Sequence, residues 1–277
     1  MKVALVTGAN SGMGLATTVE LVKKGYHVVM MCRNTRRGKV AWISAKEKTR
    51  SEELTLMYGD LGSLESIREF AAEFKKKFSR LDVLVNNAGV VAVKRQLTDD
   101  GFESHLGVNH LGHFLLTNLL LDELKAADQG RVVTVSSGAH KWGRIDFDDP
   151  HFEKGYSVAK AYGRSKLANI LFTKALSKRL EGSNVTANAV HPGAVSTNLG
   201  VNRKTEFGRG VHKVLKPFFQ SAEEGAETTV YLASSPEVEY VTGKYFYKMK
   251  EVDVSKDAEN EWLAEELWGW SEERTGL

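Results

Sequence analysis

Two tyrosine–lysine pairs in one short stretch are the residues best suited to proton chemistry. Residues 155–166 contain Tyr156 with Lys160 and Tyr162 with Lys166, each pair four residues apart. On a helix, residues at this spacing share one face. A lysine ammonium there favours the phenolate, so a phenol with an ordinary pKa near about 10 could exchange protons closer to neutrality. One pair could therefore be the acid/base group of an enzyme.

Helix phase separates the two pairs. Six residues at about 100° each turn the second pair about 120° away from the first, so the two cannot serve one site equally. Tyr156 follows Gly155 and precedes Ser157, which could cap a helix start. The first pair then spans a frayed helix end, whereas Tyr162 and Lys166 lie within the helix. We expect Tyr162→Phe to abolish turnover and Tyr156→Phe to change little.

A glycine-rich turn near the N-terminus indicates a nucleotide site. The turn lies between the first apolar run and a helical segment, and it reads Gly8, Ala9, Asn10, Ser11, Gly12, Met13, Gly14. Glycines permit a tight turn and close approach to a pyrophosphate, which then sits at the positive end of the helix. Because the turn joins a strand to a helix, a nucleotide site is favoured over an ordinary turn.

Strand-like runs alternate with helical segments along the chain. The predicted strands are Val3–Thr7, His27–Cys32, Leu54–Tyr58, Leu81–Asn86, Arg131–Ser136, Val185–Val190 and Lys244–Tyr247. The predicted helices are Gly12–Lys24, Thr35–Thr49, Ser63–Phe78, Thr98–Ala127 and Val158–Leu180. Several strands are apolar on both faces, as buried parallel strands must be. The alternation predicts a single α/β domain over residues 1–277, a doubly wound, Rossmann-type parallel sheet of about seven strands with helices on both faces.

The end of the second predicted strand favours NADP over NAD. NAD sites usually carry Asp or Glu about 20 residues beyond the glycines, to hold the ribose 2′-hydroxyl. Here the sequence reads Cys32-Arg33-Asn34, with Arg36 and Arg37 following. Arg33 could form a fork to a 2′-phosphate. Two alternatives stay open: the arginines could simply form a solvated helix start, and Asn34 could hold a 2′-hydroxyl in an NAD enzyme.

Composition excludes some classes of function. The 277 residues include 38 basic and 35 acidic side chains, a formal charge of +3 that gives no case for nucleic-acid binding. Cys32 is the one cysteine, so no intrachain disulfide is possible and a reducing, cytoplasmic location is expected. No apolar run approaches the roughly 18–20 residues of a membrane span, so no integral membrane segment is expected.

Loops and the C-terminal segment supply further candidates. Residues 138–155 and 193–220 are predicted substrate loops or lids, because ligands bind beyond the carboxyl ends of parallel strands. Residues 255–277 are a predicted helical tail rich in tryptophan, which could cover substrate, join subunits or pack on the domain. His110 and His113 lack carboxylate support and are interpreted as packed or capping residues. No cluster suggests a metal.

The chain resembles the short-chain dehydrogenase/reductase family over nearly its whole length. The motifs are the Thr7–Gly14 turn, Asp60-Leu61, Asn86-Asn87-Ala88-Gly89 and His191-Pro192-Gly193. The run Tyr162-Gly163-Arg164-Ser165-Lys166-Leu167-Ala168-Asn169 is similar to the retinol dehydrogenase-like branch. Membrane-bound members of that branch carry an apolar segment before the first strand. Here the strand begins at Val3, so we expect a soluble relative or a chain whose anchor is not included.

This resemblance implies roles for individual residues. Tyr162 would be the general acid/base, Ser137 would orient the substrate oxygen, and Lys166 would hold the ribose and lower the tyrosine pKa. Asn109 would anchor the proton relay, and Ser136 would be structural or a backbone contact to the cofactor. The cofactor residues would be Gly8, Asn10, Ser11, Gly12, Met13, Gly14, Arg33, Asn34, Asp60, Leu61, Asn87, Ala88, Gly89, Tyr162, Lys166, Pro192 and Gly193.

The expected function is NADP(H)-dependent interconversion of an apolar carbonyl compound and its alcohol, with the enzyme a homodimer or homotetramer. One rival is a non-catalytic NADP-binding sensor or scaffold on the same fold. It has no need of a polarised phenol, so the Ser/Tyr/Lys set counts against it. The other is an epimerase or dehydratase with bound NAD, whose relatives usually have a longer substrate domain and different glycine spacing.

Overall fold

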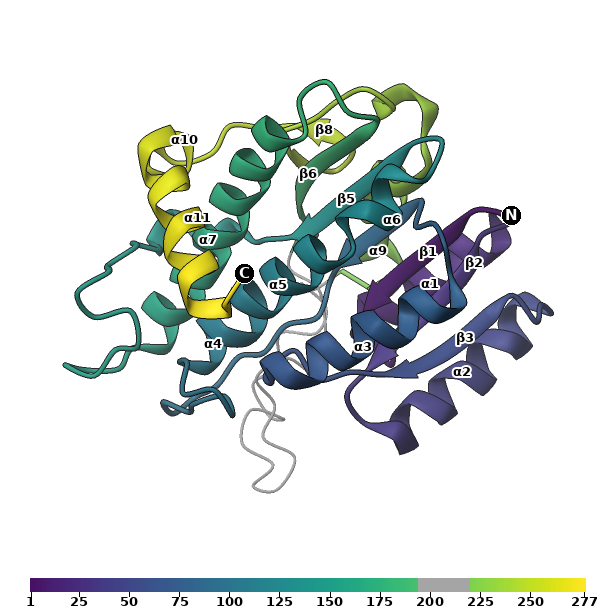
Figure 1. Cartoon of the computed structure of the whole chain (residues 1–277), viewed down its shortest axis with the longest axis horizontal. Helices are drawn as coiled ribbons and strands as arrows, with labels where there is room; N and C mark the ends of the chain where they lie inside the picture. Colours follow the sequence, from purple (N-terminus) through teal and green to yellow (C-terminus); the bar gives the residue numbers. More distant parts are fainter. Residues whose placement is uncertain (194–219) are drawn as a thin grey trace.

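An eight-stranded sheet forms the centre of the computed structural model, which describes residues 1–193 and 220–277 (Figure 1). The strand order is β3-β2-β1-β4-β5-β6-β7-β8, and every neighbouring pair is parallel except β7 with β8. The strands are β1 (Val3–Thr7), β2 (His27–Cys32), β3 (Leu54–Tyr58), β4 (Val83–Asn86), β5 (Gly130–Val135), β6 (Val185–His191), β7 (Tyr245–Tyr247) and β8 (Lys250–Glu251). The predicted doubly wound parallel sheet is confirmed.

Helices cover both faces of this sheet, as the apolar character of both strand faces requires. One face carries α1 (Gly12–Lys23), α2 (Thr35–Thr49) and α9 (Ala222–Ser234). The other carries α3 (Leu64–Lys77), α5 (Gly112–Leu119), α7 (Val158–Arg179) and α11 (Glu261–Thr275). Leu5 packs into the second layer while its neighbours Ala4 and Val6 pack into the first, because successive strand residues point to opposite faces.

Strand β8 lies beyond the predicted set of about seven. It is two residues long and follows a turn in which Lys248 and Met249 both have positive φ, 49° and 59°. Hairpin turns of this geometry usually use Asn or Gly, so these residue types gave no turn signal.

The predicted helix Thr98–Ala127 is wrong in its start and its continuity. The segment contains α4 (Ser104–Leu106), the π-helical η1 (Gly107–Leu111), α5 and α6 (Leu121–Lys125), with a break at Leu120. Residues before Ser104 form a turn closed by a bridge between Leu97 and Glu103. The Glu103 side chain accepts hydrogen bonds from the His105 and Leu106 amides, so the helix begins after it.

Helix α9 was missing from the predicted elements. It starts with a capping box, in which Ser221 and Glu224 each accept the other's backbone amide proton. The shorter helical segments are the 3₁₀ helices η2 (Gly138–Trp142) and η4 (Pro236–Val238), and α10 (Lys256–Glu259).

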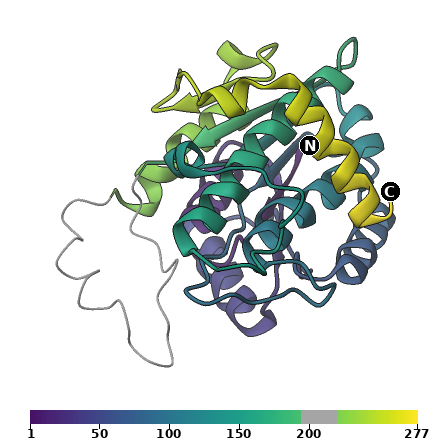
Figure 2. The ribbon, with the colours of Figure 1, turned by 90° about the vertical axis from the view of Figure 1, so that its left-hand side faces the viewer.

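The C-terminal helix α11 packs beside α5 and α7, as both ribbon views show (Figures 1 and 2). Its Trp268 is buried, with ring centroids 4.8 Å from Phe114 and 5.8 Å from Phe172. Trp262 on the same helix is exposed. In the described part of the chain, no helix is both long and apolar enough to cross a bilayer.

Candidate active site

The turn between β1 and α1 is built for close backbone approach. Gly8 and Gly12 have positive φ, 65° and 53°, which favours glycine. A Cβ on Gly14 would lie 2.6 Å from Asn87 Nδ2, so no larger residue fits there. Ser11 precedes α1 but gives it no side-chain cap among the described residues, so the first amides of the helix are left for an anion. The other predicted residues of the turn, Asn10 and Met13, are half-buried.

Thr7 joins this turn to the loop after β4 and, through a histidine, to Asn109. Its hydroxyl accepts hydrogen bonds from the Asn87 and Ala88 amides, both 2.9 Å away, and Asn87 Nδ2 donates to the Thr7 carbonyl at 2.7 Å. His113 Nδ1 lies 3.0 Å from the Asn109 carbonyl, which can only accept, so Nδ1 carries the proton. The Thr7 hydroxyl therefore donates to His113 Nε2, 2.9 Å away. Sequence reasoning missed this hydrogen-bonded chain.

Both histidines of this helical segment are buried. His110 lies 2.9 Å from the Ser271 hydroxyl and so connects η1 to α11. Burial lowers the pKa of His110 to about 3 and that of His113 to about 4. Within residues 1–193 and 220–277, no group of three or more His, Cys, Asp or Glu residues is placed to hold a metal ion.

The adenosine end of the expected site shows how its polar residues are used. The Arg33 side chain is 63% exposed, and its Nε lies 3.8 Å from the Asp60 carboxylate. Asn34 caps α2 by accepting the Arg37 amide at 2.9 Å, so its carbonyl oxygen already has a partner. Leu61 is buried next to Asp60.

The structure brings Ser137, Tyr162 and Lys166 together at the end of β5. The Ser137 hydroxyl lies within hydrogen-bonding reach of the Tyr162 phenol. The Lys166 ammonium lies 5.5 Å from the centroid of the Tyr162 ring and donates to the Val135 carbonyl at 3.1 Å. Ser136, directly after β5, connects that strand to α7, because its hydroxyl donates to the Lys166 carbonyl at 2.7 Å. Ser136 therefore has a structural contact, and Ser137 faces the phenol.

The expectation that Lys166 lowers the pKa of Tyr162 is not met by the chain alone. Burial raises the pKa of the Tyr162 phenol, and the Ser137 hydrogen bond offsets only part of this. Burial also lowers the pKa of Lys166 to about 8. Within the described residues, Lys166 Nζ donates to a backbone carbonyl and not to the phenol, so its charge is not focused on the phenol oxygen.

Asn109 lies in the π-helical segment and connects the loop after β4 to α7. Its Oδ1 accepts from the Val90 amide at 2.8 Å, and its Nδ2 donates to the Ser165 hydroxyl at 3.0 Å. Ser165 in turn donates to the Tyr162 carbonyl at 2.8 Å. A Cβ on Gly89 would lie 3.4 Å from Asn109 Oδ1 and 3.8 Å from Lys166 Nζ, so Gly89 sits against both groups.

The first tyrosine–lysine pair does not share a helix face. Helix α7 begins at Val158, so Tyr156 precedes it, and Lys160 is exposed to solvent. The Tyr156 hydroxyl donates to the Ala92 carbonyl at 2.7 Å. Burial, helped by the charge of Glu103, raises the pKa of Tyr156 to about 12. Tyr156 is thus a hydrogen-bond donor to a loop near the site.

The predicted substrate loop 138–155 is tied firmly to α7. Buried Arg164 donates to the carbonyls of Arg144 (2.9 Å) and Asp149 (2.7 Å), and its guanidinium lies 3.8 Å from the Phe152 ring centroid. Gly143 packs against Gly163 so closely that neither has room for a Cβ. These contacts hold this part of the chain against α7 as a wall that faces α11.

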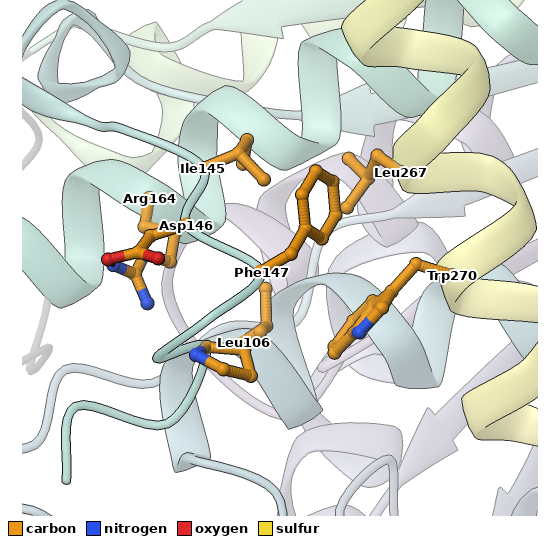
Figure 3. Close-up of a pocket in the computed structure, with 8 residues that line it drawn as sticks. Leu106, Ile145, Asp146, Phe147, Arg164, Leu267 and Trp270 are labelled. Carbon is orange, nitrogen blue, oxygen red and sulfur yellow. The ribbon is translucent and has the colours of Figure 1, made fainter.

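A small cavity lies between this wall and α11 (Figure 3). Ile145, Phe147 and Trp270 line it, and its volume is about 10 Å³, enough for a water but not for a substrate. None of the predicted catalytic residues lines it. The second predicted substrate loop, 193–220, lies almost wholly outside the described residues. At its start, Gly193 follows Pro192 after β6 with φ of 85° and donates its amide to His191 Nδ1 at 3.2 Å.

These residues fit a nicotinamide dinucleotide. The turn around Gly14 has no space for a side chain, and the first amides of α1 can receive a pyrophosphate. The buried Lys166 ammonium lies beside Gly89, where it could donate a hydrogen bond to a ribose hydroxyl. The predicted cofactor residues outside α7 lie at the carboxyl ends of β1 to β4 and β6, in the loops there or in the first turn of α1, which is the edge where open α/β sheets bind ligands.

The sheet order, the glycine turn and the Ser/Tyr/Lys arrangement define a dinucleotide-dependent oxidoreductase of α/β class. Residues 2–207 match the family described as short chain dehydrogenase, and the chain belongs to this family. It is 46% identical to human retinol dehydrogenase 14 over 299 residues, covering 100% of this chain and 87% of that protein.

Solved structures share this fold. An uncharacterised protein from Mycobacterium paratuberculosis superposes with a TM-score of 0.80 at 37% identity, covering 100% of this chain and 94% of that one. A single-residue variant of actinorhodin polyketide ketoreductase, solved with NADPH, gives a TM-score of 0.68 at 28% identity, with 88% and 94% coverage.

Proposed function

We propose that this enzyme interconverts an apolar aldehyde or ketone and its alcohol, with NADP(H) as the hydride carrier. The observation that carries the proposal is the proximity of Ser137, Tyr162 and Lys166 at the end of β5, together with a glycine turn that fits a dinucleotide. The retinol dehydrogenase relatives support an apolar substrate. The exposed Arg33 and the ketoreductase solved with NADPH support NADP.

In the reducing direction, the Ser137 hydroxyl and the Tyr162 phenol donate hydrogen bonds to the substrate carbonyl oxygen, which polarises the carbonyl. Tyr162 then gives its proton to the oxygen as the alcohol forms. The nicotinamide, when bound, supplies the hydride for reduction or accepts it in oxidation. The Lys166 ammonium stabilises the tyrosinate that remains, and Asn109 keeps Ser165 and α7 in place.

The raised pKa of Tyr162 in the chain alone fits the role of proton donor. A phenol that keeps its proton at neutral pH can give it to an oxyanion. For alcohol oxidation the phenolate is needed, and the positive charge of a bound nicotinamide ring together with Lys166 would favour it.

A panel of apolar aldehydes, ketones and alcohols, assayed with NADPH or NADP and with NADH or NAD, tests this proposal. We expect turnover of at least one carbonyl compound with NADPH, loss of that turnover in Tyr162→Phe, and no change in Tyr240→Phe, whose phenol is 84% exposed. NADPH binding without turnover of any compound would favour a sensor or scaffold instead. A homodimer or homotetramer and a cytoplasmic location stay predictions.

A further inference from the structure

In the loop that follows β4, the backbone amide and carbonyl of Val90 and of Ala92 are all hydrogen-bonded to side chains. Asn109 accepts the Val90 amide at 2.8 Å and donates to the Val90 carbonyl at 3.3 Å. One turn earlier, His105 Nε2 accepts the Ala92 amide at 3.0 Å, and Tyr156 donates to the Ala92 carbonyl at 2.7 Å. This loop directly continues the cofactor residues 87–89 and lies beside the predicted catalytic groups. Its shape is therefore set by three side chains from distant parts of the sequence.

The protonation of His105 follows from these contacts. Because Nε2 accepts the Ala92 amide, it carries a lone pair, and the proton must be on Nδ1. Nδ1 donates to Glu103 Oε1 at 2.7 Å. Glu103 is fully buried and also accepts the amides of His105 (3.0 Å) and Leu106 (3.1 Å). A carboxylate placed in this way fixes both the tautomer and the orientation of an imidazole.

The Glu103 carboxylate keeps its charge in spite of its burial. Burial alone would raise the pKa of this carboxyl, but hydrogen bonds from the His105 side chain and backbone outweigh it and hold the pKa below its usual range. The pair is thus an internal support and has no access to solvent.

The His105 ring lies between the two tyrosines of the doubled motif. Its centroid is 6.1 Å from that of Tyr162, edge to face at 69°, and 6.3 Å from that of Tyr156, stacked at 24°. One imidazole therefore contacts the ring of the predicted proton donor and holds Ala92 of the adjacent loop. Tyr156, to which the sequence assigned no role, belongs to the same cluster.

We propose that His105 is a positioning residue, held by Glu103 and aided by Tyr156; this inference rests on the proposed function. His105 fixes the Tyr162 ring relative to loop 90–92, so that an apolar carbonyl compound meets the phenol in a reactive geometry. Displacement of a reacting group by about 1 Å can cost about 100-fold in rate. The predicted cofactor residues of this loop precede Val90, and the amides of Asn87 and Ala88 are held by Thr7, so we expect NADPH binding to depend little on this cluster.

Two substitutions separate the contacts of His105. In His105→Asn the amide nitrogen replaces Nδ1 and keeps the bond to Glu103, but the Ala92 amide and the contact with Tyr162 are lost. In His105→Gln the amide oxygen lies near the position of Nε2 and can still accept the Ala92 amide. We expect His105→Asn to lower kcat/KM for the best carbonyl substrate about tenfold or more, with the Kd for NADPH changed less than about twofold. His105→Gln should recover part of this loss.

Two further variants complete the set. Tyr156→Phe removes the donor to the Ala92 carbonyl, so we now expect a raised KM with a smaller change in kcat, in place of the small effect expected from sequence. His27→Asn is the matched control, because His27 Nδ1 also pairs with a carboxylate, Glu53 at 2.8 Å, but at the opposite end of the sheet. It should leave kcat/KM unchanged.

Amide hydrogen exchange at Ala92 tests the cluster without any turnover. Protection should fall in His105→Asn and persist in His105→Gln. Wild-type kcat/KM and Ala92 protection in His105→Asn would overturn the proposal, as would equal losses of activity and NADPH binding in the Asn and Gln variants. If the wild-type protein reduces no carbonyl compound, the proposed function fails, and the exchange result alone then decides whether His105 holds the loop.

Discussion

Acid should unfold this protein through two buried histidines. Burial lowers the pKa of His110 to about 3 and that of His113 to about 4, against about 6.5 in an unfolded chain. Both pKa values in the folded state lie below that in the unfolded state, so below pH 6.5 the unfolded state binds more protons. The free energy of unfolding therefore decreases as the pH is lowered. The loss continues down to about pH 4 for His113 and about pH 3 for His110.

The size of the effect follows from these values. Between pH 6.5 and pH 5, each histidine costs about 1.4 kcal/mol per pH unit, or about 2 kcal/mol. Together the two remove about 4 kcal/mol, a large part of the roughly 5–15 kcal/mol that stabilises a typical domain. A protonated His113 could also no longer accept the Thr7 hydroxyl, so acid should break the chain from the cofactor turn to Asn109.

Urea unfolding at pH 8, 7, 6 and 5 measures this loss. The double variant His110→Gln/His113→Asn removes both titrating rings. In it, the Gln amide can donate to Ser271 and the Asn amide to the Asn109 carbonyl, as the ring nitrogens do. We expect the wild-type protein to lose about 4 kcal/mol more than this variant between pH 7 and pH 5. An equal loss in both proteins would refute the reasoning, because the acid sensitivity would then come from other groups.

Four further outcomes can be measured directly. Tyr162→Phe should lower kcat by about 10²- to 10⁴-fold and leave NADPH binding nearly intact in titrations, because it removes the proton donor alone. Arg33→Ala should weaken NADPH about tenfold or more and NADH far less, and a matched loss would exclude a 2′-phosphate contact. Between pH 8 and 10.5, the free energy of unfolding should increase by up to about 3 kcal/mol as the pH rises, because the pKa of buried Lys166 is lower in the folded than in the unfolded state. Lys166→Met should abolish that increase. Trp268→Ala should cost about 3–5 kcal/mol in chemical unfolding, because a buried ring between Phe114 and Phe172 is lost.

Most of the sheet and its helices could be predicted because their signals are local. Strands such as β1 and β2 are apolar runs bounded by turn residues, and α7 shows its face through spacing alone. Two of the errors are missed local signals, because Glu103 caps α4 through the amides of the next turn and Ser221 with Glu224 forms the capping box of α9. Strand β8, in contrast, exists because it pairs with β7.

The candidate site divides in the same way. Tyr162 and Lys166 were chosen from their spacing on one helix, and the glycine turn from its place between a strand and a helix. The raised pKa of Tyr162 in the chain alone could not be predicted, because a spacing of four residues does not tell how deeply a phenol is buried or where a lysine Nζ donates.

The sequence by itself determined the family, the strand–turn–helix that fits a dinucleotide, and which tyrosine shares a helix face with a lysine. These features depend on residues close together in the chain, where geometry follows from helix and strand periods. Only the tertiary structure showed the path from Thr7 through His113 to Asn109, and the position of His105 between Tyr156 and Tyr162. Those contacts join residues as much as 106 positions apart, and packing of the whole domain brings them together.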